Sequence, residues 1–253
     1  MLELTGDSLT LEQVEAVARA DERDVVLAAA ARARVERARS LVDELASAEE
    51  PVYGVTTGFG RLAEVRIPRA RRAELQVNLV RSHAAGVGPL LSDEEVRAMT
   101  LLRANALAKG HSGCRVEVIE RLLDFLRHGL HAVVPSFGSV GASGDLAPLA
   151  AVALALTGEG EVTLDGERLS AAEALARRGV EPLILREKEG LALINGTQAT
   201  TALGTLALLA AERAVDTAEV AGAATLEGLR GTPVPFAEAV HRTRPHRGQQ
   251  ESA

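Results

Sequence analysis

Apolar residues recur every three or four positions along most of the chain, which is the spacing of one face of an α-helix. Two capping boxes, Thr10 with Gln13 and Ser92 with Glu95, open amphipathic runs. The same spacing predicts helices over residues 24–48, 69–83, 94–109 and 116–126. We therefore expect a mainly α-helical fold.

Two further stretches depart from this amphipathic pattern. Residues 197–221 are apolar almost all round, which predicts burial inside a helix bundle or at a subunit interface. In residues 161–169, apolar and polar positions alternate on both sides of Asp165-Gly166. This is the one segment whose pattern predicts β-strands, in the form of a small β-hairpin. Loops are expected over residues 52–60, 131–145 and 191–198.

Composition narrows the class of protein. Hydrophobic residues make up 47% of the 253 and charged residues 25%, which is typical of a globular chain. Aromatic residues are only 2%, with no tryptophan, so Ala, Leu and Val must build the core, which favours close-packed helices over a β-sandwich. The net charge of −7 argues against a nucleic-acid partner.

Three features predict a soluble cytoplasmic protein. Cys114 is the single cysteine and cannot form an internal disulfide, which fits a reducing compartment. The first ten residues lack the basic and apolar pattern of a signal peptide. The longest apolar stretch, residues 202–211, is too short to span a bilayer, so no membrane partner is expected.

The tripeptide Ala142-Ser143-Gly144 has an unusual chemical possibility. In a tightly bent backbone, the Gly144 nitrogen can attack the Ala142 carbonyl carbon, and loss of water closes a five-membered ring. Loss of the Ser143 hydroxyl as a second water leaves an exocyclic methylidene. Glycine suits such a strained position because it has no Cβ. The tripeptide alone is common, however, and by itself far more often marks a turn before a helix capped at Gly144 or Asp145.

The surrounding sequence favours the first interpretation. Residues 138–150 read Gly-Ser-Val-Gly-Ala-Ser-Gly-Asp-Leu-Ala-Pro-Leu-Ala and resemble the signature of the aromatic amino acid lyase family. This family comprises ammonia-lyases of histidine, phenylalanine and tyrosine, and related aminomutases. Residues 52–60, 75–88 and 189–198 resemble its other motifs in the same order, and the likeness extends to about residue 248. It implies that Ala142-Ser143-Gly144 cyclises autocatalytically to methylideneimidazolone, with no metal and no diffusible cofactor.

The resemblance also implies roles for three polar residues. Tyr53 would be the general base that removes the β-proton of the substrate, although a lone tyrosine among glycines is usually a packing residue. Asn195 would donate a hydrogen bond to the imidazolone oxygen, whereas by position it is equally a turn residue. Ser82-His83 resembles the histidine-directed branch, in which His83 would bind the substrate imidazole.

Supporting roles are expected for three more positions. Gly60 ends a glycine-rich loop that lacks the G-x-G-x-x-G order and a following Gly-Lys-Ser/Thr, which favours a lid over a nucleotide site. Asp145 is a helix N-cap, a group that holds the cyclising loop, or both. Gln198 closes the last matching motif. No metal site is expected, because no ligand spacing connects His111, His128 and His131.

The implied reaction eliminates ammonia from L-histidine to give trans-urocanate, with phenylalanine or tyrosine as alternative substrates. Family members form homotetramers and continue well past this point, so the chain is expected to be an N-terminal part that is inactive alone. On this interpretation residues 1–195 form the domain with the electrophile loop, 196–231 begin a central helical bundle, and 232–253 form an unpacked tail. The rival hypothesis is a non-enzymatic helical fragment or assembly partner.

Overall fold

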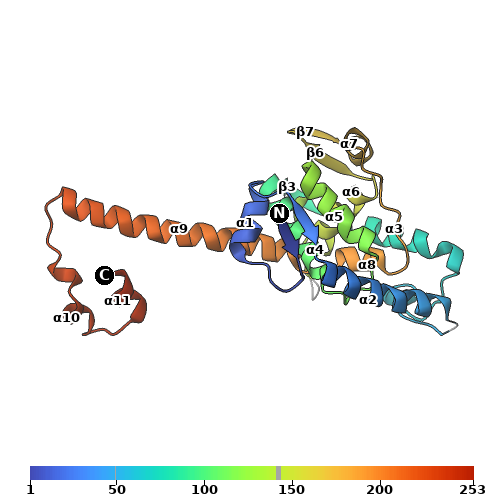
Figure 1. Cartoon of the computed structure of the whole chain (residues 1–253), viewed down its shortest axis with the longest axis horizontal. Coiled ribbons are helices and arrows are strands. Elements are labelled where there is room, and N and C mark those ends of the chain that lie inside the picture. Colours follow the sequence, from blue (N-terminus) through green and yellow to red (C-terminus); the bar gives the residue numbers. More distant parts are fainter. Residues whose placement is uncertain (49, 141–143) are drawn as a thin grey trace. The chain divides into compact units, whose positions relative to one another are not determined.

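The computed structural model describes residues 1–48, 50–140 and 144–253 and is mainly α-helical, as predicted (Figure 1). The chain forms two units, Met1–Thr205 and Leu206–Ala253. The helices of the first unit are α1 Leu11–Ala18, α2 Ala29–Ser47, α3 Arg72–His83, α4 Asp93–Ala108, α5 Val116–His128, α6 Leu146–Leu156, α7 Ala171–Arg178, α8 Glu189–Ile194 and the start of α9 Gln198–Gly228. Two 3-10 turns, η1 Gly60–Leu62 and η2 Arg69–Arg71, precede α3.

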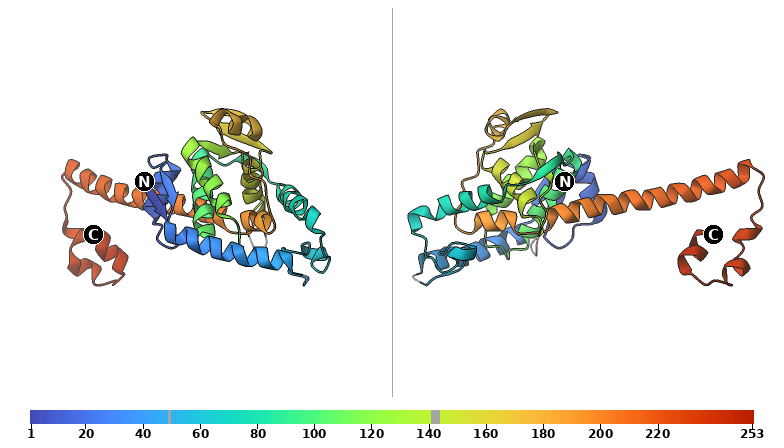
Figure 2. Two further views of the ribbon diagram at one scale, coloured as in Figure 1. Left: turned by 45° about the vertical axis from the view of Figure 1, so that its right-hand side comes forward. Right: turned by 180° about the vertical axis from the view of Figure 1, so that it is seen from behind.

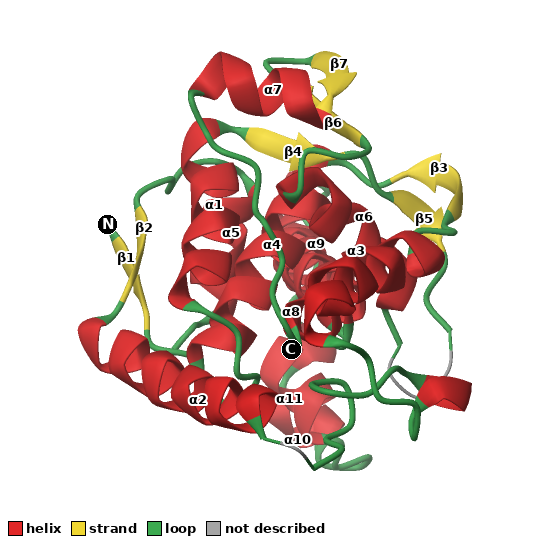
Figure 3. Ribbon diagram, turned by 90° about the vertical axis from the view of Figure 1, so that its right-hand side faces the viewer, coloured by secondary structure: helices red, strands yellow, loops and turns green. Residues whose placement is uncertain are grey.

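Helix α4 lies at the centre of the first unit and packs against α1, α2 and α5, as Figure 3 shows from the side. Both predicted capping boxes are confirmed, Thr10 before α1 and Ser92 before α4. Helix α5 buries one continuous apolar face that includes Ile119, Leu122 and Phe125. The small, aliphatic core expected from the composition is therefore built between these helices.

Within the described ranges, seven short strands form three small sheets. β1 Leu2–Leu4 pairs in parallel with β2 Val25–Leu27, and β3 Val87–Leu90 pairs antiparallel with β5 Pro135–Phe137. The third sheet joins β4 Leu130–Ala132, β6 Glu161–Leu164 and β7 Glu167–Ser170. The hairpin and α7 lie at one end of the first unit, and α2 lies at the other (Figure 2).

The predicted hairpin is confirmed, and its turn has positive φ at Asp165 and Gly166, as its tight geometry requires. Three local predictions are wrong. The helix expected from residue 24 begins only at Ala29, because residues 25–27 pair with the first strand instead. The loop expected over 191–198 begins inside α8, and the loop expected over 131–145 contains the end of β4 and all of β5. The other five strands were not predicted from the sequence. Each has only three or four residues, too few to show an alternation of apolar and polar positions.

A buried ion cluster connects three of these helices. The Glu189 carboxylate is fully buried at the start of α8 and accepts two hydrogen bonds of 2.8 Å from the Arg115 guanidinium. The backbone nitrogen of Arg186 donates a third bond, and Arg39 of α2 lies 3.8 Å away. Loss of one partner of a buried ion pair typically costs about 3–5 kcal/mol, so this cluster fixes where α8 begins.

The second unit consists of the rest of α9 and three short elements, η3 Val234–Phe236, α10 Glu238–His241 and α11 Arg247–Ser252. Ala199, Ala202 and Leu209 of α9 are buried, but Val215 and Val220 are 58% and 70% exposed, so the described residues leave apolar surface on the second half of this helix uncovered. Its burial against other helices or subunits stays a prediction, as do the bounds of the three expected segments. Among the described residues, no helix is both long and apolar enough to cross a membrane.

The environment of Cys114 generates a chemical prediction. Burial, reinforced by the Glu189 carboxylate, raises the pKa of this thiol to about 12, and its side chain is 1% exposed. Such a pKa leaves roughly a thousandfold less reactive thiolate at pH 8 than an exposed cysteine has. An aromatic disulfide reagent at pH 8 should therefore label the folded chain far more slowly than the chain in guanidinium. Equal labelling rates would contradict the buried position.

Candidate functional site

Four of the residues singled out in the sequence line one hollow of about 430 Å³. They come from segments far apart in the chain, namely the loop after α2, the end of α3 and the end of α8. The lining residues are Tyr53, Phe59, Gly60, Leu79, Ser82, His83, Leu146, Leu191, Ile194 and Asn195. The fold therefore brings the predicted base, the predicted ring-binding residue and the predicted amide to a single mostly apolar recess.

The loop that carries Tyr53 has a defined local structure. The Thr56 hydroxyl accepts a 2.7 Å hydrogen bond from the Val52 nitrogen, which closes a tight turn around Tyr53. Gly54 has φ +70°, and a Cβ there would lie 2.9 Å from the Phe59 ring. The Tyr53 and Phe59 rings meet edge to face at 5.9 Å, while the Tyr53 side chain stays 56% exposed. The aromatic contact orients the phenol without burying it.

His83 lies on the last turn of α3, and its ring orientation is fixed by the backbone. Its Nδ1 lies 2.8 Å from the Leu79 carbonyl oxygen, and the Ser82 hydroxyl lies 3.1 Å from the same Nδ1. Because a carbonyl oxygen can only accept, the contact with Leu79 requires the proton on Nδ1. In the neutral ring Nε2 is then an acceptor, suited to a ligand that presents an N–H group.

Asn195 follows α8 in a turn that a buried arginine holds together. Arg103 of α4 is 5% exposed; it donates to the Ala192 carbonyl and, at 2.8 Å, to the Gln198 side chain. Burial lowers the pKa of Arg103 to about 10. Gly196 is required beside it, since a Cβ there would lie 2.3 Å from the Arg103 Nη1 atom. Gln198 thus acts through Arg103 rather than in the hollow.

Asp145 is the group that joins the flanks of the proposed electrophile. Its carboxylate is fully buried and accepts hydrogen bonds from the Ser139 hydroxyl, the Thr200 nitrogen at 2.7 Å and the Thr200 hydroxyl at 2.8 Å. Asp145 occupies the N-cap position of α6, but its side chain makes no capping bond to that helix. Of the two expected roles, its contacts match the holding of the loop.

The tripeptide itself is only partly described. Ala142 and Ser143 lie outside the described residues, and Gly144 has φ +76°. The Val140 nitrogen donates a 2.8 Å hydrogen bond to the Gly144 carbonyl, so the backbone on both sides comes together. The Asp145 nitrogen also donates to the Gly196 carbonyl at 3.1 Å, which connects this loop to the turn of Asn195.

Sequence reasoning missed three residues that position the site, Arg103, Ser139 and Thr200. Arg103 does carry a signal, because it is a charged residue within the apolar run Leu101–Leu107 of α4. Ser139 lies within the signature of residues 138–150, but its contact with Asp145, like that of Thr200, depends on the tertiary fold. Among the described residues, no cluster of three or more His, Cys, Asp or Glu side chains gathers as a metal site.

Adjacent threonines allow a matched test of the Asp145 cluster. Thr200→Val keeps the side-chain shape but removes a hydrogen bond to a buried charge, which should lower the free energy of unfolding by about 1.5–3 kcal/mol. Thr201→Val removes only a bond to the Thr197 carbonyl within the helix, so about 0.5 kcal/mol or less is expected. Urea denaturation followed by circular dichroism measures both. Equal losses would show that the Thr200 hydroxyl has no special weight.

Comparison with known proteins places this geometry in a family. A family model described as aromatic amino acid lyase matches residues 9–253. The chain is 57% identical to histidine ammonia-lyase of Anaeromyxobacter dehalogenans, over 99% of this chain and 50% of that protein. It is 51% identical to the same enzyme of Koribacter versatilis, over 100% and 49%. The chain thus spans about half the length of the curated relatives it matches.

Comparison with solved structures leads to the same family. Histidine ammonia-lyase from Trypanosoma cruzi superposes with a TM-score of 0.91 at 39% identity, covering 99% of this chain and 48% of that one. Tyrosine aminomutase from Streptomyces globisporus superposes with a TM-score of 0.90 at 43% identity, covering 99% and 47%. With its signature loop, its hollow and these relatives in agreement, the chain belongs to the aromatic amino acid lyase family.

Proposed function

We propose that this chain is the N-terminal part of a histidine ammonia-lyase, which eliminates ammonia from L-histidine to give trans-urocanate. The observation that carries the proposal is that Tyr53, His83 and Asn195 line one hollow, although they are distant in the sequence. A backbone hydrogen bond also connects the turn that follows Asn195 to Asp145, directly after the Ala142-Ser143-Gly144 tripeptide. The curated relatives carry the same enzyme name.

The residues around the tripeptide fit a methylideneimidazolone. Gly144 is already in a positive-φ conformation, and a Cβ there would press against Thr197 at 3.3 Å, which favours glycine at the cyclising nitrogen. Ser139, Asp145 and Thr200 hold the two flanks together, which favours a compressed loop. The group would form from this backbone alone and, once formed, would supply an electrophilic methylidene for the amine of the substrate.

The side chains of the hollow then have distinct tasks. The exposed Tyr53 phenol, oriented by Phe59, would take the β-proton of the substrate. The Asn195 amide would donate to the imidazolone oxygen and stabilise charge that develops there. His83, with its proton held on Nδ1, would accept a hydrogen bond from the substrate imidazole at Nε2. The apolar lining would limit water around the reacting bond.

Two related substrates and an assembly belong to the same proposal. Tyrosine and phenylalanine aminomutases are among the similar solved structures, so a phenyl or phenol side chain is the alternative to imidazole. Imidazole is favoured, because a phenyl ring would leave the His83 acceptor without a partner. Assembly into a homotetramer would cover exposed apolar side chains of α9 such as Val215 and Val220.

Cyclisation has a direct mass signature. We expect this chain, joined to the remaining half of the Anaeromyxobacter dehalogenans relative, to be lighter than its sequence mass by two water molecules. Ser143→Ala removes the hydroxyl that leaves as the second water, so the full two-water loss should not occur and urocanate formation should fall by several orders of magnitude. Intact-mass spectrometry and an ultraviolet urocanate assay measure the two effects. Normal turnover by the variant would overturn the proposed electrophile.

Ser82 and His83 should determine which substrate ring, imidazole or phenyl, the site prefers. In the same joined chain, the double change Ser82→Phe with His83→Leu removes the acceptor for imidazole and enlarges the apolar lining. An unpaired buried polar group costs about 1–3 kcal/mol, so kcat/KM for histidine should fall roughly tenfold to hundredfold, and phenylalanine should gain relative to it.

Tyr53→Phe is the matched control for this experiment. It should abolish turnover of both amino acids while the mass loss of the tripeptide remains, because the phenol is assigned to proton removal and not to cyclisation. Unchanged histidine turnover in the double variant would rule out His83 as the ring-binding residue.

A further inference from the structure

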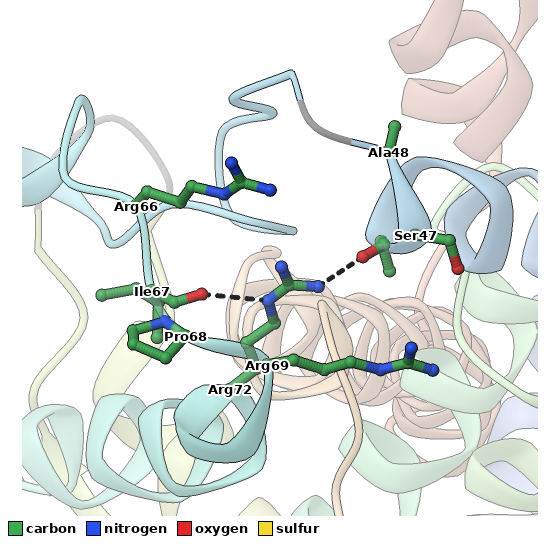
Figure 4. Close-up of a pocket in the computed structure, with 8 residues that line it drawn as sticks. Ser47, Ala48, Arg66, Ile67, Pro68, Arg69 and Arg72 are labelled. Carbon is green, nitrogen blue, oxygen red and sulfur yellow. Dashed lines mark hydrogen bonds between the residues drawn. The ribbon is translucent and has the colours of Figure 1, made fainter.

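A second recess lies away from the hollow, where the Tyr53 loop rejoins the helices. It has a volume of about 360 Å³ and lies between the C-terminal end of α2 and the start of η2 (Figure 4). Three arginines line it, Arg66, Arg69 and Arg72, and none of the described residues that line it is acidic. For a chain with a net charge of −7, this is a local concentration of positive charge.

Arg72 is the fixed part of this recess. Its side chain is 4% exposed, Nε donates to the Ile67 carbonyl at 3.1 Å, and Nη1 donates to the Ala46 carbonyl at 2.5 Å. Figure 4 shows both bonds on one guanidinium whose third nitrogen has no bond drawn to it. Nη2 has no hydrogen-bond partner among the described residues and is not fully enclosed. The recess therefore has a buried, preoriented donor.

Arg66 and Arg69 are exposed and carry charge that the described residues do not neutralise. Neither side chain has a hydrogen bond or ion pair within the described ranges, whereas the neighbouring Arg71 pairs with Glu74 at 3.2 Å. The C-terminal end of α2 contributes the equivalent of about half a negative charge. Three guanidinium groups outweigh it, so the described lining of the recess carries an excess of positive charge.

From these observations we propose that the recess is a binding site for a small, multiply charged oxyanion. Guanidinium groups present parallel N–H donors that match phosphate and carboxylate oxygens, and three of them favour a ligand with more than one negative charge. The volume is near the lower end of the range for small-molecule pockets, which suits a phosphate ester, a pyrophosphate or a polycarboxylate. Nothing in this proposal depends on the lyase reaction.

The test is a calorimetric titration of the 253-residue chain with pyrophosphate, at constant ionic strength set by chloride. We expect saturable binding of one pyrophosphate per chain. Arg66→Gln and Arg69→Gln each remove one exposed donor and should each weaken binding about tenfold. Both side chains are exposed, so the fold should tolerate either change.

Arg37→Gln is the matched control. Arg37 lies on α2 and is exposed like Arg66 and Arg69, but it does not line the recess. It should bind pyrophosphate as the unaltered chain does. A parallel titration with citrate distinguishes a preference for phosphate from a preference for polycarboxylates. The site is supported if pyrophosphate or citrate binds saturably and if Arg66→Gln and Arg69→Gln weaken that binding. Absence of saturable binding by both probes, or equal weakening by Arg37→Gln, would overturn it.

Discussion

A carboxylate that is fully buried must find its hydrogen-bond donors inside the protein, and Asp145 finds them on segments far apart in the chain. Ser139 lies before the tripeptide, and Thr200 lies on the first turn of α9. An unmet bond at this position would cost more than most single contacts contribute, so alternative packings of the loop are disfavoured. The described residues on either side of the tripeptide are therefore positioned by a charge outside it.

The same principle recurs on the other side of the hollow. Arg103 places a buried cation between α8 and α9, and Glu189 places a buried anion where α8 begins. Each has partners on at least two elements, so α8 is fixed at both ends and Asn195 is presented by a short, rigid helix. Buried polar groups of this kind stabilise less than apolar packing would, but they select one arrangement among many.

Local features of the fold could be predicted from the sequence, and long-range ones could not. The capping boxes at Thr10 and Ser92 and the Asp165-Gly166 hairpin depend on neighbours within a few residues. The strand at residues 25–27 depends on a partner more than twenty residues away, and so was mistaken for helix. The grouping of Tyr53 with Asn195 could be expected only from the resemblance to the family, because no helical or strand spacing in the sequence connects two residues so far apart.

The guanidinium of Arg72 joins the Ala46 carbonyl to the Ile67 carbonyl, and so closes the segment that carries Tyr53 into a loop with fixed ends. For such a loop, doubling the number of residues costs only about 0.6 kcal/mol in closure entropy. Residues can therefore be inserted or exchanged within it while the helices on either side stay in place. Side chains on this rim of the hollow can thus change while the helices that carry the rest of its lining keep their positions.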